Sequence, residues 1–194
     1  ILIGMIAIID YGLGNVRSVA GAVQKVGFEA LITSSIEEFR RADALILPGV
    51  GAFGDGMKNL RERGLIDPLK EIVVGEGKRF LGICLGAQLL ARNSEEFGHH
   101  EGLGWIDASV VRLSPAGDYR VPHVGLNDCI QKQPSALFHS IPADALFYFV
   151  HSYHIVCNDS TLVIGESDYG GPVTAALQRK NIYATQFHPE KSQQ

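Results

Sequence analysis

The sequence has few cysteines and lacks the patterns that would give them a structural role. Among 194 residues there are three, Cys84, Cys129 and Cys157, an odd number without a CxxC pair. This argues against a disulfide framework and against a zinc knuckle. We therefore expect a protein of the reducing cytoplasm.

Charge of one sign and long apolar runs are also scarce. The net charge of -4 gives no reason to expect a nucleic acid or an anionic membrane as a partner. No apolar run approaches the roughly 18 residues that a membrane-spanning helix needs, and no secretory signal is visible. The 46% of hydrophobic residues can build a proper core.

We expect one domain over residues 5–194, because the chain shows no repeat, low-complexity segment or linker. The segment "MIAIIDYG" resembles a natural start at Met5. Residues 1–4 are therefore interpreted as non-native or upstream residues.

Strand and helix patterns alternate in the first half. Strands are expected at 5–10, 28–33, 44–47 and 80–83, and helices at 15–26, at 35–41, from near Asp55, from Asp67-Pro68, and along the helix-forming run 88–92. Asn15 is a suitable N-cap, and Pro68 suits a first helical position. This βαβα pattern predicts a parallel sheet covered on both faces. In the second half, six strands, mostly antiparallel additions, are expected at 106–113, 121–130, 146–150, 162–167, 173–178 and 182–187.

A cysteine lies between two glycines where a strand is expected to turn into a helix, in Gly82-Ile83-Cys84-Leu85-Gly86. This is the form of a nucleophile elbow, in which a sharp turn leaves room only for glycines beside the nucleophile. The helix start favours a thiolate, and the Leu85 N–H would face a developing oxyanion. A buried structural cysteine is an equally good interpretation of this pentapeptide alone.

A thiol nucleophile needs a base and a group that orients the base. In "TQFHPEKS", Pro189 favours extended geometry at His188, and residues two apart in an extended segment share one side. Glu190 could then hold His188 towards Cys84. The alternative is a simple turn with a solvated Glu190.

Two glycine-rich loops are candidate ligand sites. Pro48-Gly49-Val50-Gly51 follows a strand and can donate a second oxyanion hydrogen bond, although a plain turn or a phosphate cradle is also conceivable. A nucleotide P-loop is excluded because its lysine and hydroxyl are missing. Gly12-x-Gly14 lacks the third glycine of a dinucleotide site. The histidines form no metal-ligand pattern, so we expect no metal and no organic cofactor.

The order of these pieces resembles the class I (triad-type) glutamine amidotransferases. The segments "DYGLGN", "LPGVGAFGDGM", "GICLGAQLL", "PHVGLN", "FYFVHSYH" and "QFHPEKSQ" narrow the resemblance to the glutaminase subunits of imidazole glycerol phosphate synthase. It extends from Met5 to Gln193. It implies a flavodoxin-like α/β fold with an open mixed sheet. It also implies hydrolysis of glutamine, and transfer of the ammonia to a cyclase (β/α)8-barrel partner in a heterodimer of histidine biosynthesis.

The resemblance assigns roles to particular residues. Cys84 becomes the nucleophile, His188 the acid and base, and Glu190 its orienting group, with oxyanion donors at Val50, Gly51 and Leu85. Glutamine contacts are implied at Gly51, Gln88, Glu96, Ser152 and Tyr153. The partner interface is implied at Asn15, Pro122, His123, Gly125, Leu126, Asn127 and Lys191.

Two departures from the family and several rival functions stay open. Leu126 replaces the usual tryptophan of "PHxGWN", and the helix that usually follows "HPEKSQ" has no counterpart before Gln194. Leu126 leaves room for a paralogous subunit that supplies ammonia for an amino or amidino sugar of surface polysaccharides. A cysteine peptidase-like hydrolase and a non-catalytic binding protein of the same fold are the rivals from other classes.

Overall fold

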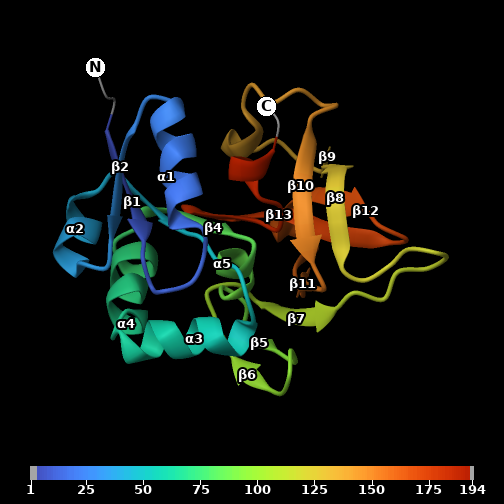
Figure 1. The fold of residues 1–194 in the computed structure, drawn as a ribbon, viewed down its shortest axis with the longest axis horizontal. Coiled ribbons are helices and arrows are strands. Elements are labelled where there is room, and N and C mark those ends of the chain that lie inside the picture. Colours follow the sequence, from blue (N-terminus) through green and yellow to red (C-terminus); the bar gives the residue numbers. More distant parts are fainter. Residues whose placement is uncertain (1–3, 193–194) are drawn as a thin grey trace.

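The computed structural model describes residues 4–192, and its main element is an eight-stranded sheet (Figure 1). The strand order is β2-β1-β3-β4-β14-β13-β12-β9. The strands are β1 Met5–Ile9, β2 Glu29–Thr33, β3 Ala44–Leu47, β4 Arg79–Ile83, β14 Ile182–Thr185, β13 Pro172–Arg179, β12 Val163–Asp168 and β9 Ile130–Gln131. The first five are parallel and the last three antiparallel, so the predicted open mixed sheet is confirmed. The prediction that residues 1–4 are non-native or upstream falls mostly on residues 1–3, which lie outside the described range.

Helices cover both faces of the parallel part, as predicted. Alternate strand residues face opposite ways, so Ala7 and Ile9 join one core while Ile8 joins another. Helix α1, Val16–Lys25, packs its buried residues against the Ile8 side. The other face carries α2 Ile36–Arg41, α3 Phe53–Glu62, α4 Ile66–Leu69, the π-helical η1 Lys70–Gly75 and α5 Leu85–Gln88. Asn15 caps α1 as predicted, with its side-chain oxygen accepting from the Ser18 N–H at 3.4 Å.

Two helix predictions are wrong in detail. Helix α4 begins at Ile66, so Pro68 is its third residue, not its first. A proline is tolerated there because first-turn N–H groups have no partner within a helix. The run 88–92 does not extend a helix, because α5 ends at Gln88. The Leu90 and Ala91 N–H groups instead bond three residues back, in a turn that leads into a short strand.

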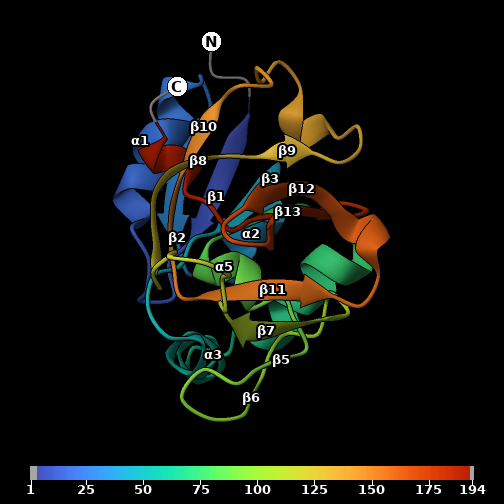
Figure 2. The ribbon, with the colours of Figure 1, turned by 90° about the vertical axis from the view of Figure 1, so that its right-hand side faces the viewer.

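The second half adds two small sheets beside the main one (Figures 1 and 2). One pairs β8, His123–Asp128, with β10, Leu146–His151. The other has the order β11-β7-β5-β6, formed by Tyr153–Cys157, Ala108–Arg112, Asn93–Ser94 and His100–Glu101. Single 3-10 turns lie at η2 Ala136–Phe138, η3 Ser160–Leu162 and η4 Pro189–Lys191.

The strand predictions for this half hold for most segments, but not for every strand. Strands β5, β6 and β11 were not predicted, and β14 is not an antiparallel addition. It enters the main sheet parallel to β4, with Thr185 opposite Ile83. Its place between β4 and β13 brings the segment that follows it, with His188, next to the cysteine elbow.

Within residues 4–192, no helix is both long and apolar enough to cross a membrane.

Candidate active site

Three neighbouring parallel strands end at the same edge of the sheet and there deliver the three predicted catalytic segments. Strand β3 leads into residues 48–51, which we call the oxyanion loop, β4 leads into Cys84, and β14 leads towards His188. Ligands of open α/β sheets bind outside the carboxyl ends of the strands. The adjacency of β3, β4 and β14 is therefore what assembles the site.

Cys84 occupies a strained turn between β4 and α5. Its φ of 52° lies in the left-handed region, which costs a non-glycine residue free energy. The Cys84 N–H donates to the Thr185 carbonyl at 2.7 Å and so continues the pairing of β4 with β14. Leu85 is the first residue of α5, where an N–H has no acceptor within its own helix. The turn thus presents a sulfur and a free backbone donor together.

The glycines on either side of Cys84 are required by close packing. A Cβ on Gly82 would lie 2.7 Å from the Gly86 oxygen, and one on Gly86 only 1.9 Å from the Leu47 oxygen. Backbone atoms cannot retreat as a side chain can. The elbow predicted from the glycine spacing is therefore present in the structure.

Replacing Gly86 with alanine should destabilise the fold by more than about 3 kcal/mol, because the added methyl overlaps the β3 backbone. Gly21→Ala is the matched control. Gly21 lies within α1, and apart from its chain neighbours and the helix's own backbone no described atom lies within 4 Å of a Cβ added there. Alanine at this position should stabilise the fold by about 1 kcal/mol. Urea denaturation of both variants checks this, and equal stabilities would refute the packing argument.

His188 and Glu190 form a buried pair beside this turn. The His188 Nδ1 and Glu190 Oε1 atoms lie 2.8 Å apart, and the side chains are 2% and 3% exposed. The predicted contact is present, but the backbone differs from the extended segment that we expected. Glu190 lies in the 3-10 turn η4, which brings its carboxylate back to Nδ1 of the imidazole. Among the described residues, His188 Nε2 has no hydrogen-bond partner.

The surroundings keep His188 protonated. Burial alone lowers the pKa of His188, but the Cys84 sulfur and the Glu190 carboxylate outweigh it and raise the pKa to about 9. Because Nδ1 faces Glu190, the proton on Nε2 is the one available for transfer. The site therefore holds an acid next to a nucleophile at neutral pH.

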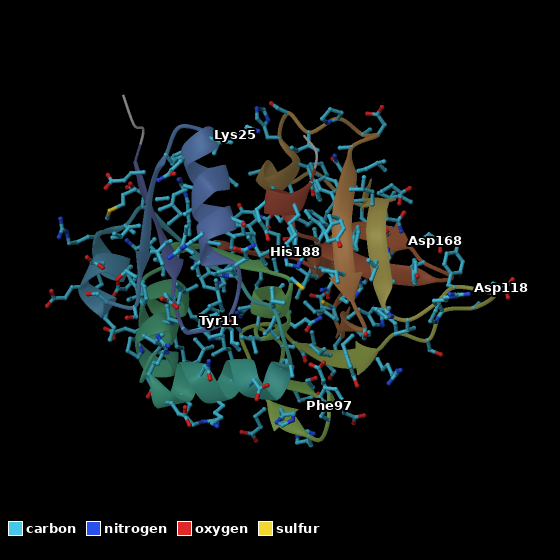
Figure 3. The ribbon with its side chains drawn as sticks, in the orientation of Figure 1. Tyr11, Lys25, Phe97, Asp118, Asp168 and His188 are labelled. Carbon is cyan, nitrogen blue, oxygen red and sulfur yellow. The ribbon has the colours of Figure 1, made fainter. Side chains whose placement is uncertain are left out.

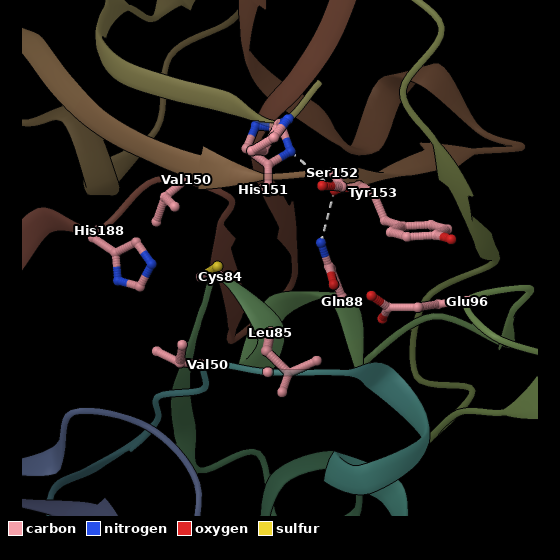
Figure 4. Close-up of a pocket in the computed structure, with 12 residues that line it drawn as sticks. Val50, Cys84, Leu85, Gln88, Glu96, Val150, His151, Ser152, Tyr153 and His188 are labelled. Atoms are coloured by element: carbon pink, nitrogen blue, oxygen red, sulfur yellow. Dashed lines mark hydrogen bonds between the residues drawn. The ribbon is translucent and has the colours of Figure 1, made fainter. Parts of the chain in front are cut away.

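Cys84 and His188 line one cavity of about 300 Å³ (Figure 4). The cavity also reaches all the predicted oxyanion residues and glutamine contacts, namely Val50, Gly51, Leu85, Gln88, Glu96, Ser152 and Tyr153. This volume is at the lower end of the range for small-molecule sites. The structure thus brings the predicted catalytic and substrate residues together.

Two of these residues are already engaged by the protein. The Gln88 Nε2 donates to the Tyr153 carbonyl at 2.9 Å and to Gln186 Oε1 at 3.0 Å, so only its oxygen is free for a ligand. Glu96 Oε2 accepts from the Phe53 N–H at 2.8 Å, at the start of α3. This hydrogen bond connects the segment after β5 to the first residue of α3, the helix that follows the oxyanion loop.

A chain of buried polar groups connects this cavity with strand β8. The Tyr153 carbonyl accepts from Gln88 and faces His151 Nδ1 at 2.9 Å, so that nitrogen carries the proton. His151 Nε2 then accepts from His123 Nδ1 at 3.1 Å. Burial lowers the pKa of His123 to about 4 and that of His151 to about 3, so both rings are neutral.

Strand alternation divides the predicted partner segment between two faces. His123, Gly125 and Asn127 point inward, and His123 is only 2% exposed because it stacks on Phe149 and Tyr169. His123 is therefore part of the interior next to the implied partner surface, and the role of this segment at a partner interface stays a prediction. Leu126 does face solvent, at 43% exposure.

The remaining predicted interface residues occupy separate places. Pro122 lines the cavity itself. Asn15 is exposed, but its side chain caps α1. The Lys191 ammonium lies 5.9 Å from the centre of the Tyr148 ring, which pairs with Leu126 across β8 and β10. Lys191 and Leu126 therefore belong to one surface.

Several residues of the site were not predicted. Gln186 donates to the Cys84 sulfur at 3.7 Å, while Val150 and His151 line the cavity. The only signal for Gln186 was its place two residues before His188, which puts the two on the same side of an extended segment.

An elbow cysteine beside a buried histidine–carboxylate pair is the arrangement used by triad-type hydrolases. Comparison with known families makes this class specific. The model of the family "Glutamine amidotransferase class-I" matches residues 7–194, and the chain belongs to this family.

Curated relatives are similar along nearly the whole chain. "Imidazole glycerol phosphate synthase subunit HisH" of Syntrophotalea carbinolica is 47% identical, over 98% of this chain and 94% of its own. The protein of the same name in Desulfitobacterium hafniense is 48% identical, over 97% and 88%.

Solved structures support the fold alone, because their sequence identities are low. The structure of PurLQS from Thermotoga maritima has a TM-score of 0.76 and 20% identity, covering 97% of this chain and 88% of that one. A structure described as a glutamine amidotransferase has a TM-score of 0.70 and 23% identity, over 95% and 90%. The predicted class I amidotransferase fold is confirmed.

Proposed function

We propose that the chain is the glutaminase subunit of imidazole glycerol phosphate synthase in histidine biosynthesis. Near-full-length relatives at 47% and 48% identity carry that name. The observation that carries the catalytic part is the strained Cys84 in one cavity with the hydrogen-bonded pair of His188 and Glu190. The relatives' names favour histidine biosynthesis over the sugar-pathway alternative.

Each protein group has one task in the reaction. The Cys84 thiolate attacks the side-chain amide carbon of glutamine, and the Leu85 N–H stabilises the oxyanion, with the Val50 or Gly51 N–H as second donor. The C–N bond breaks as His188 protonates the leaving ammonia. A glutamyl thioester remains, and His188 then takes a proton from the water that attacks it. Glutamate leaves and the thiolate returns, so no redox partner is required.

Substrate recognition falls to the polar groups at the other end of the cavity. We assign the free oxygen of Gln88, the second oxygen of Glu96, and Ser152 and Tyr153 to contacts with glutamine. An acidic Glu96 suits the α-ammonium group of an amino acid. This feature favours glutamine over the substrates of a peptidase-like rival.

The partner surface is assigned to the outer face of β8 and β10. Alternation places Val124, Leu126, Leu146, Tyr148 and Val150 on this face, and Val124, Leu126 and Leu146 are 54%, 43% and 49% exposed. Val150 also lines the catalytic cavity. A partner seated here would cover the mouth of the cavity and could receive ammonia without loss to solvent. The relatives are named as a subunit of a synthase, which supports the presence of a partner subunit. We propose that this partner is a cyclase barrel in a heterodimer.

We also propose that residues 5–194 act as one domain of a cytoplasmic enzyme. The main sheet contains strands from both ends of this range, and all three cysteines are unpaired thiols, which fits a reducing compartment.

Ammonia release by the isolated chain should be slow and should rise when the ligand-loaded cyclase binds. Gly51, with a φ of 117°, and Gly49, two residues earlier, allow the oxyanion loop to turn its peptide planes. One misdirected oxyanion donor lowers a rate by roughly 10²–10³. Steady-state glutamine hydrolysis is measured for the chain alone, with cyclase, and with cyclase plus its phosphoribosyl ligand.

A variant that places a charge on the proposed partner surface provides the control. Leu126→Glu should weaken complex formation and the activation that depends on it, while the slow rate of the isolated chain stays the same. Equal rates in all three wild-type conditions would contradict partner gating.

A further inference from the structure

Tyr11 lies two residues beyond the end of β1 and is fully buried, although it has no task in the reaction described above (Figure 3). Its backbone is fixed by α3. Asn59 Nδ2 donates to the Tyr11 carbonyl at 3.0 Å, and Arg63 Nη1 donates to the Asp10 carbonyl at 3.2 Å. The ring belongs to the largest core cluster, so its position is set by packing on all sides.

The Tyr11 hydroxyl has no hydrogen-bond partner among residues 4–192. A buried polar group without a partner destabilises a fold, and phenylalanine would fill the same space without this cost. The hydroxyl therefore has no structural benefit in the arrangement that is observed.

The oxyanion loop lies directly against this hydroxyl. A Cβ on Gly49 would lie 2.6 Å from the Tyr11 oxygen, 2.7 Å from Leu85 Cβ and 2.8 Å from the Gly86 nitrogen. The buried Tyr11 hydroxyl and the start of α5 therefore both meet the oxyanion loop at Gly49. The loop carries one proposed oxyanion donor, and the start of α5 carries the other.

The hydroxyl is a neutral donor in this setting. Burial raises the pKa of Tyr11, and the nearby Cys84 charge raises it further. A neutral phenol can donate one hydrogen bond, and a backbone carbonyl is the natural acceptor in a loop made of glycine, proline and valine.

We propose that Tyr11 is a positioning residue for the oxyanion loop, whose hydroxyl donates to the Gly49 carbonyl when the Val50 N–H turns towards Cys84. The carbonyl oxygen and the N–H of one trans peptide point in opposite directions. An N–H directed into the cavity therefore sends the Gly49 oxygen inward, towards the side where Tyr11 lies. The Tyr11 hydroxyl has no hydrogen-bond partner in the observed arrangement. In the active arrangement it donates to the Gly49 carbonyl, and this hydrogen bond stabilises that arrangement.

The inference rests on the proposed glutaminase function, and Tyr11→Phe tests it in the complete complex with ligand-loaded cyclase. We expect kcat to fall about tenfold, the value of one net hydrogen bond. KM for glutamine should stay constant, because Tyr11 is not among the residues that line the cavity. Tm should stay equal or rise, since an unpaired buried hydroxyl is removed.

Tyr183→Phe is the matched control. The Tyr183 hydroxyl lies on β14 and accepts only a long hydrogen bond of 3.4 Å from Gln178, so its loss should leave kcat unchanged. Alkylation of Cys84 by iodoacetamide, which needs no oxyanion donor, should proceed equally in the wild type and both variants.

Three results would overturn the inference: an unchanged kcat in Tyr11→Phe, a loss confined to KM, or a fall in Tm parallel to the loss of activity. If the wild-type complex releases no ammonia at all, the proposed function fails together with the inference. Normal release by both the wild type and Tyr11→Phe refutes the role of Tyr11 alone.

Discussion

Replacing Cys84 with alanine should abolish ammonia release from glutamine while the fold is retained. The side chain supplies the only atom in the cavity that we expect to form a bond to the substrate, and removal of a triad nucleophile lowers kcat by roughly 10⁶-fold. The variant should melt near the wild-type temperature, because only one sulfur atom leaves the core. Ammonia release and thermal denaturation are measured on the same preparation.

The other two cysteines provide matched controls. Burial and the charge of Asp128 raise the pKa of the Cys129 thiol to about 12. Burial and the charges of Asp159 and Asp107 raise that of Cys157 to about 11. Both thiols are therefore protonated and unreactive at neutral pH. Cys157→Ala and Cys129→Ala should keep the wild-type rate, and a surviving rate in Cys84→Ala would refute the assignment of the nucleophile.

Replacing His188 with alanine should lower kcat by about 10²–10⁴, the usual value of general acid–base catalysis. Both proton transfers of the reaction depend on Nε2, the ring atom turned away from Glu190. A smaller loss is expected for Glu190→Gln, because the amide can still orient the ring but carries no charge. If Glu190→Gln proved as damaging as His188→Ala, Glu190 would have a more direct task than orientation.

The pH profile adds a second readout for the same pair. His188 must be protonated to release ammonia, and its pKa of about 9 keeps the wild type active into the alkaline range. Glu190 helps to raise this pKa, so its neutralisation lowers the pKa. The alkaline limb of the kcat profile should therefore move to lower pH in Glu190→Gln. An unmoved limb would show that Glu190 does not set the protonation of His188.

Local patterns in the sequence predicted those features of the site that short-range geometry controls. The two glycines around Cys84 indicated an elbow, because the steric demand acts within five residues, although the pentapeptide alone also suited a buried structural cysteine. The contact of His188 with Glu190 was predicted for the same reason, although η4 turned out to be a 3-10 turn. Strand alternation in β8 follows from an equally local rule, and it divides the implied partner segment into a buried His123 and an exposed Leu126.

Contacts between residues far apart in the sequence could not be predicted from such local patterns. The Gln88–Gln186 hydrogen bond joins residues 98 positions apart, and the approach of Tyr11 to Gly49 depends on how the segments that follow β1 and β3 pack against each other. The position of β14 between β4 and β13 has no local signal either, since strand order follows from packing of the complete sheet. The polar network around Cys84 was therefore visible only in three dimensions.

The central claim is that Cys84 is the nucleophile for glutamine, and covalent labelling tests it most directly. The complex is incubated with a chloroketone analogue of glutamine, and the modified residue is located by peptide mass spectrometry. The account predicts one adduct, on Cys84, whose formation excess glutamine prevents. An adduct on Cys129 or Cys157, or labelling of Cys84 that glutamine does not slow, would contradict it.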